Sequence, residues 1–268
     1  MNMVPHEEFQ KLLSEISKLQ DTLAYLYFEK DELQFQTCKN IEMEYMLKIG
    51  VLEYNLYEIE TQILRIRRKL ELIRQKINRQ ETFIIEAIEK QLDVEYEEYT
   101  KKLKAQYEIF QNALTRKESG FLDKDKAKEV KKLYGVIVKK LHPDLLPEPD
   151  NAKNELFLKA VEAYKNGDYE TLSAISLMVD KPDPQSTNPS TMEELKKKHS
   201  SLQERIINIT AIIADIKRSF PYDQIDFLNS PELVEQRKNE LTEKINEYNT
   251  AYGQYEQKLN ELTGGTTQ

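Results

Sequence analysis

Residues 49–77 of this 268-residue chain read IGVLEYNLYEIETQILRIRRKLELIRQKI. Apolar side chains recur in this stretch at alternating steps of three and four residues: Ile49, Leu52, Leu56, Ile59, Ile63, Ile66, Leu70, Ile73 and Ile77. That spacing is typical of a coiled-coil helix, whose apolar seam faces another helix. It predicts one long helix that needs a partner, and it favours an all-α fold made of elongated antiparallel coiled-coil units.

Two further seams lie on either side of this stretch. One runs from Phe9 to Thr37, and we expect a break at residues 38–40 between it and the next helix. The other is tyrosine-rich, runs from residue 85 to 113 and follows a polar turn at residues 78–82. Because short turns make neighbouring helices antiparallel, residues 1–118 are predicted to form a three-helix antiparallel coiled coil.

The C-terminal part of the chain shows the same pattern beyond a proline-rich segment. Residues 181–190 contain three prolines and are predicted to be a linker. Thr191 and Glu194 have the spacing of a capping box that begins a helix. The Phe220-Pro221 pair is expected to end that helix, and Pro231 to begin the last one. Residues 191–268 are therefore predicted to form a coiled-coil hairpin.

Residues 119–180 are predicted to form a small helical domain between these units. A first helix is expected at residues 126–141. A second follows Asp150, which can cap it, and ends at Gly167, which can adopt the left-handed conformation. A third helix is expected from Tyr169 to Val179, capped by Asp168. The first two helices would form a hairpin.

The tripeptide His142-Pro143-Asp144 joins the helices of this hairpin. The residue before a proline is disfavoured in the helical region, so the helix should end at Leu141 and leave His142 and Asp144 on a tight, exposed turn. The preceding helix carries a cluster of basic residues that includes Lys131, Lys132, Lys139 and Lys140. Exposed charge at a rigid turn suggests a docking surface. The alternative is that the turn residues only cap helix ends, and that the lysines form an ordinary solvated surface.

Residues 131–144, together with Phe157 and residues 162–164, resemble the second helix, signature loop and third helix of the J domain in DnaJ-type co-chaperones. The layout also resembles bacterial coiled-coil proteins with an internal J-like domain. The resemblance implies docking to the acidic groove of a DnaK-type ATPase chaperone, with the coiled coils binding a client or partner. The implied chaperone-binding residues are His142, Pro143, Asp144, Lys131, Lys132, Tyr134, Lys139 and Lys140.

A different hypothesis is a coiled-coil scaffold or self-assembly protein that keeps a J-like fold only as a structural part. After the tyrosine the J-domain family usually has arginine and then lysine, where this chain has Gly135 and Val136. That departure favours the scaffold. Tyr134, Phe157 and Tyr164 are interpreted as core residues, with functional contact as the alternative. Exposed seams would predict a homodimer, and self-sealed hairpins a monomer.

Composition narrows the class of function. A net charge of −8 and a pI near 5.2 disfavour nucleic-acid binding, which needs a dominant basic face. A single cysteine, no basic-apolar leader and no run of about 18 apolar residues predict a cytoplasmic protein with no membrane span. The sequence contains no nucleophile motif, phosphate loop or metal-spaced cluster, so we expect no enzyme activity, cofactor or metal.

Overall fold

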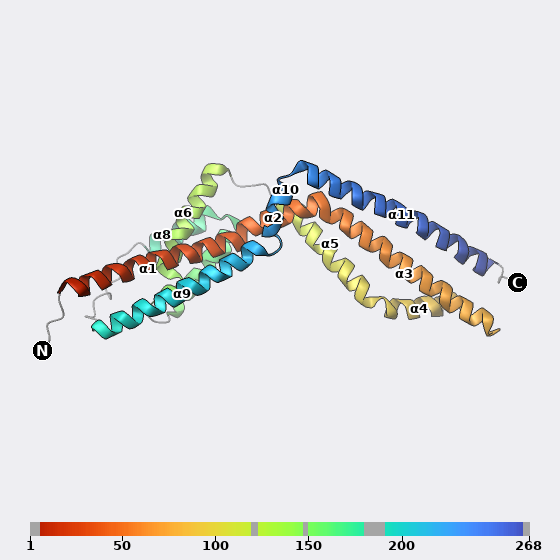
Figure 1. Ribbon diagram of the computed structural model, residues 1–268, viewed down its shortest axis with the longest axis horizontal. Helices are drawn as coiled ribbons and strands as arrows, with labels where there is room; N and C mark the ends of the chain where they lie inside the picture. Colours follow the sequence, from red (N-terminus) through yellow and green to blue (C-terminus); the bar gives the residue numbers. More distant parts are fainter. Residues whose placement is uncertain (1–5, 119–122, 147–149, 180–190, 265–268) are drawn as a thin grey trace. The chain divides into compact units, whose positions relative to one another are not determined.

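The computed structural model describes residues 6–118, 123–146, 150–179 and 191–264 (Figure 1). The described residues are almost entirely helical and include no strand, which confirms the predicted all-α class. They separate into two compact units. The first unit consists of Met1–Asn40 and Gly120–Asp223, and the second of Ile41–Ser119 and Gln224–Gln268. The predicted 181–190 linker lies outside the described residues.

The first helical stretch is longer than the sequence predicted. It comprises α1 (His6–Glu32), the π-helical turn η1 (Leu33–Thr37), α2 (Cys38–Tyr45), a second π-helical turn η2 (Met46–Gly50) and α3 (Val51–Asn78). The break expected at residues 38–40 was therefore wrong. A π-helical turn holds one extra residue and shifts the phase of the apolar seam without breaking the helix. The two π-helical turns therefore explain why the three-four spacing of apolar residues is interrupted between Thr37 and Ile49 although the helix continues.

In the first unit, α1 packs along α9 (Met192–Arg218), and the two helices run in the same direction (Figure 1). Glu15 lies against His199 and Glu29 against Lys217, so positions increase together along both helices. The sequence predicted different, antiparallel partners for both helices. Parallel neighbours need a long connection, and the more than 150 residues between α1 and α9 provide one.

Three shorter helices complete the first unit: α6 (Lys124–Leu141), α7 (Asn151–Asn166) and α8 (Tyr169–Val179). They match the helices predicted from the sequence. The Asp150 side chain accepts a hydrogen bond from the Lys153 amide, and Gly167 ends α7 with a φ of 67°. The first core combines these helices with α1 and α9, and its largest fully buried side chains include Tyr134 and Tyr164.

In the second unit, α3 packs against α11 (Pro231–Gly264) and against α4 (Ile85–Glu95) and α5 (Glu97–Glu118). Arg65 pairs with Glu89 and Arg68 with Glu95, whereas Tyr54 contacts Tyr107. Because the α5 contact lies nearer the start of α3, the segment formed by α4 and α5 runs antiparallel to α3, the direction that the short connection predicted.

The C-terminal helices pair differently from the predicted hairpin. The capping box of Thr191 and Glu194 and the start at Pro231 are confirmed. However, α9 packs in the first unit, whereas α11 packs along α3 in the second. The connection contains η4 (Tyr222–Gln224) and α10 (Ile225–Leu228). Arg237 near the start of α11 pairs with Glu53 near the start of α3, so these helices run in the same direction (Figure 1).

Candidate functional site: the His-Pro-Asp turn

The backbone of the His142-Pro143-Asp144 turn follows the local prediction. Helix α6 ends at Leu141, and His142 leaves the helical region with φ −58° and ψ 125°. Pro143 begins the 3-10 turn η3 (Pro143–Leu145). The Asp144 amide donates a hydrogen bond of 3.1 Å to Nδ1 of His142. The proline and this hydrogen bond together hold the turn in one conformation.

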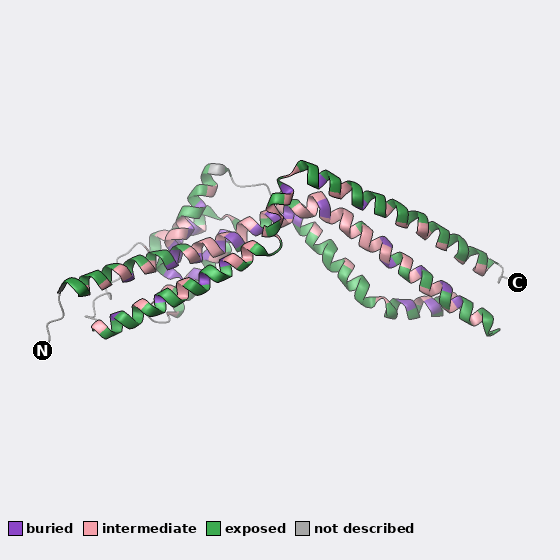
Figure 2. Cartoon of the chain, viewed as in Figure 1, coloured by how far each residue is buried: buried purple, intermediate pink, exposed green. Residues whose placement is uncertain are grey.

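The side chain of His142 is buried, although the sequence predicted that it would be exposed. Only 7% of the residue is accessible to solvent. Its ring stacks on Tyr27 of α1, with centroids 3.9 Å apart, and Phe157 of α7 meets it edge-on at 5.0 Å. The prediction of exposure was wrong because a turn's local geometry does not reveal what a distant helix places over it. Figure 2 shows the buried positions where α1 meets these helices.

Burial also determines the protonation state of His142. It lowers the pKa of the imidazole to about 4, against a partly opposing effect of the Asp144 and Asp31 carboxylates. The ring is therefore neutral at pH 7. Because Nδ1 accepts a hydrogen bond from the Asp144 amide, the ring proton lies on Nε2. His142 accordingly makes no ion pair with Asp144 at neutral pH.

Asp144 and Pro143 lie on the outer side of the turn and are exposed, as predicted for Asp144. Arg205 of α9 donates a hydrogen bond to the Asp144 carbonyl oxygen and lies 3.6 Å from its carboxylate. Burial raises the pKa of Tyr27, and the nearby Asp144 carboxylate raises it further. Two helices that are remote in sequence therefore hold this turn.

A polar network lies beneath the turn, between α1 and the α6–α7 hairpin. The rings of Tyr134 and Tyr164 stack with centroids 4.0 Å apart. Tyr134 donates a hydrogen bond of 2.7 Å to the buried Asp31 carboxylate, and Tyr164 donates one of 2.8 Å to Glu32. Burial and these carboxylates raise the pKa of both tyrosines. The interpretation of the two rings as core is confirmed, but the sequence did not predict the acidic partners of their hydroxyls.

The four lysines of α6 that were predicted to bind a chaperone are exposed, and three of them contact groups within the first unit. Lys131 pairs with Glu32, and Lys139 lies 2.6 Å from Asp21. Lys140 donates a hydrogen bond to the Val179 carbonyl oxygen. Lys132 is also exposed on this helix. Acidic partners that the resemblance placed on a chaperone are thus present on α1, although exposed pairs of this kind contribute little to stability.

Gly135 lies where α6 approaches α1. A Cβ atom added at this glycine would lie 3.8 Å from the ring of Phe28, an ordinary contact distance. A longer side chain directed toward α1 would meet that ring. Gly135, which departs from the J-domain pattern, is therefore half-buried beside Phe28 of α1.

Sequence reasoning missed the residues of α1 and α9 that cover the site, namely Tyr27, Asp31, Glu32 and Arg205. One signal was available for two of them. The charged run Lys30-Asp31-Glu32 interrupts an otherwise apolar seam, and a buried carboxylate needs hydrogen-bond donors from a neighbouring element. Nothing in the sequence indicated that α6 and α7 would supply those donors.

Among the described residues, no group of three or more His, Cys, Asp or Glu side chains could hold a metal ion. No buried side-chain polar atom in the described part of the chain lacks a hydrogen-bond partner. The described helices also include none that is long and apolar enough to span a bilayer. The contacts that the structure does show hold the turn against α1, α7 and α9.

Comparisons with known proteins give no match from which a family could be assigned to this chain. No protein-family model, no curated protein and no solved structure matches this chain. The resemblance to the J domain therefore depends on the short motifs in the sequence.

Proposed function

We propose that this protein is a helical scaffold in which the His-Pro-Asp segment serves as an internal joint. The joint would hold α6, α7 and α8 against α1 and α9. The observation that carries the proposal is the position of His142, which lies buried between Tyr27 and Phe157. A residue that recognises another protein has to be accessible, whereas this imidazole is covered by the protein's own helices.

The charges around the turn support the same role. Arg205 binds the Asp144 carbonyl oxygen, and carboxylates of α1 pair with Lys131 and Lys139. An acidic groove of a chaperone would have to compete with these contacts. Phe28 of α1 also lies beside Gly135, so α1 covers this position of α6 as well.

A DnaK-type co-chaperone is the second candidate, and one observation favours it. The Asp144 side chain is 55% exposed, and the Lys139 side chain is 61% exposed. An approaching protein could reach both groups without moving α1. In that case the chaperone would contact the exposed outer side of the turn, and the buried His142 ring would only hold the turn in place.

Single-turnover ATP hydrolysis by a DnaK-type chaperone separates these candidates. We expect no stimulation by the wild-type protein if the turn is only a joint. Asp144→Asn is the informative variant because its side chain is exposed and the fold should tolerate the change. Asp215→Asn, on the exposed surface of α9, is the matched control. Stimulation that survives in the control and disappears in Asp144→Asn would reject the scaffold in favour of the co-chaperone.

A further inference from the structure

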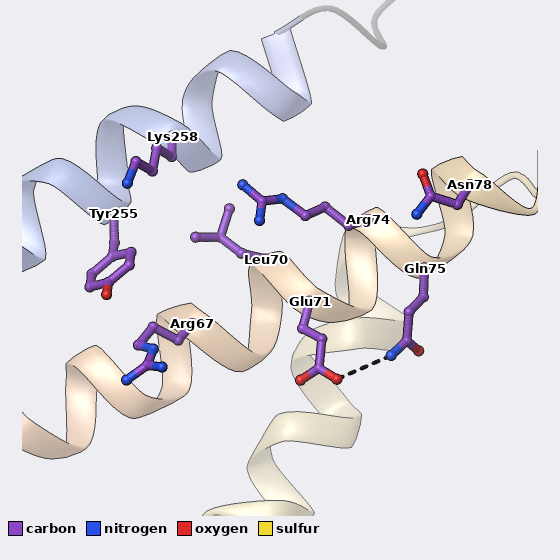
Figure 3. A pocket seen from close by; sticks show the side chains of 8 residues that line it. All are labelled: Arg67, Leu70, Glu71, Arg74, Gln75, Asn78, Tyr255 and Lys258. Carbon is purple, nitrogen blue, oxygen red and sulfur yellow. Dashed lines mark hydrogen bonds between the residues drawn. The ribbon is translucent and has the colours of Figure 1, made fainter.

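A pocket with a volume of about 280 Å³ lies between α3 and α11 in the second unit. Arg67 and Arg74 reach it from α3, and Tyr255 and Lys258 reach it from α11 (Figure 3). Leu70, which is 4% exposed, lies between the two arginines and forms the apolar floor. The pocket is close to the lower end of the size range of small-molecule sites, which begins at about 300 Å³.

The three cations of this pocket differ from other cations of α3 in their ion pairs. Within the described part of the chain, Arg67, Arg74 and Lys258 make no ion pair. By contrast, Arg65, Arg68 and Lys69 on the same helix pair with carboxylates of α4. The chain has a net charge of −8, so carboxylates are in excess over cations. The lack of ion pairs at these three residues is therefore not due to a shortage of carboxylates.

The one carboxylate that lines the pocket is already engaged. Glu71 accepts a hydrogen bond of 2.9 Å from Arg68 and one of 3.1 Å from Gln75, and Figure 3 marks the second. It therefore does little to neutralise Arg67 and Arg74. The three cations line one depression from two helices and leave it with a net positive charge.

The spacing of the cations indicates the shape of the anion. Arg67 and Arg74 are seven residues apart on one helix, which places their backbones about 10 Å apart along its axis. Guanidinium groups bind phosphate oxygens through paired N–H donors, and Lys258 adds a point charge from the opposite helix. A chain of two or three phosphates can contact all three groups, whereas a single small anion would reach fewer of them.

We infer that this pocket binds a small polyphosphate anion. The half-buried ring of Tyr255 lies beside it, with the Lys258 ammonium 5.5 Å from the ring centroid, and its remaining surface can accept an attached base or other flat group. The inference does not depend on the scaffold proposal, since none of the residues belongs to the His-Pro-Asp turn or to the first unit.

Isothermal titration calorimetry of the full chain tests the inference, with inorganic triphosphate and ATP as separate probes in the absence of divalent metal. We expect saturable binding of one site per chain. Equal affinities would mean that only the phosphates are recognised. Tighter binding of ATP, lost in Tyr255→Ala, would mean that the base stacks on the ring. Either result supports the site.

The variant Arg67→Gln/Arg74→Gln should weaken binding at least about tenfold. The loss of one hydrogen bond between a charged side chain and the ligand already lowers the affinity by about that factor. Lys102→Gln/Lys104→Gln on α5 removes the same charge from an exposed surface outside the pocket and serves as the control. The inference is overturned if neither probe binds at millimolar concentration, or if both double variants weaken binding equally. The second outcome would indicate only a general effect of net charge.

Discussion

The ring of His142 stacks on the ring of Tyr27, with the two centroids 3.9 Å apart and the planes inclined by 22°. Tyr27 lies on α1, and His142 lies in the turn that follows α6, more than a hundred positions later in the chain. The sequence predicted an exposed turn, but this contact buries the His142 side chain in the interface between α1 and the turn.

The hydrogen bond from Tyr134 to Asp31 should contribute measurably to stability. Tyr134→Phe leaves a buried carboxylate without this donor, so we expect the free energy of unfolding to fall by about 1.5–3 kcal/mol. Urea denaturation followed by circular dichroism measures the change. Tyr25→Phe, on the exposed side of the same α1 helix, should change stability little. Equal effects of the two variants would contradict the role of the buried pair.

Gly135 should tolerate alanine but not arginine. The Cβ of alanine would make an ordinary contact with Phe28, and replacing a glycine inside a helix gains up to about 1 kcal/mol. Arginine would overpack the space between α6 and α1, at a cost of about 1–3 kcal/mol. Thermal denaturation of Gly135→Ala and Gly135→Arg compares them directly. An arginine variant as stable as the alanine variant would mean that α1 does not approach α6 closely in solution.

Arg205 should hold the turn from the side of α9. Arg205→Ala removes the hydrogen bond to the Asp144 carbonyl oxygen, and we expect a loss of about 1 kcal/mol because the guanidinium is partly exposed. Arg218→Ala removes a more exposed arginine from the same helix and is the matched control. Chemical denaturation provides the comparison. The contact has no structural importance if both variants retain the stability of the wild type.

Local features of the chain were predictable from the sequence. The end of α6 before His142-Pro143, the caps at Asp150 and Asp168 and the capping box at Thr191 all depend on backbone geometry within a few residues. Each of these signals is confirmed. The all-α class followed from the period of the apolar seams, which is likewise a local property.

The partner of each helix was not predictable in the same way. An apolar seam such as that of α1 can pack against any other seam of similar length, so periodicity does not distinguish α9 from α3. The burial of His142 depends on that choice, because Tyr27 reaches it only when α1 lies over the α6–α7 hairpin. The fold elements could thus be predicted, whereas the covered state of the candidate site could not.

Acid should weaken the protein through His142. The pKa of this imidazole is about 4 in the folded protein and about 6.5 in the unfolded chain. Below about pH 6.5 the unfolded chain therefore binds a proton that the folded protein does not, and stability falls until the pH reaches about 4. Between pH 7 and pH 5 this amounts to about 2 kcal/mol.

Urea denaturation at those two pH values checks this expectation, with His142→Gln as the comparison. The variant has no titrating ring, so its loss of stability between pH 7 and pH 5 should be smaller by the same amount. Other groups contribute equally to both proteins and cancel in the difference. An unchanged pH dependence in the variant would show that the folded protein does not perturb His142.

The most direct test of the covered turn is the pKa of His142, measured by NMR titration of the histidine ring protons in the wild-type protein. His142→Gln assigns the resonance, and Tyr27→Ala, which removes the stacked ring, should move the pKa back toward 6.5. We expect a wild-type value near 4. A value near 6.5 in the intact protein would mean that the imidazole faces solvent, and it would contradict the internal joint on which the proposed function depends.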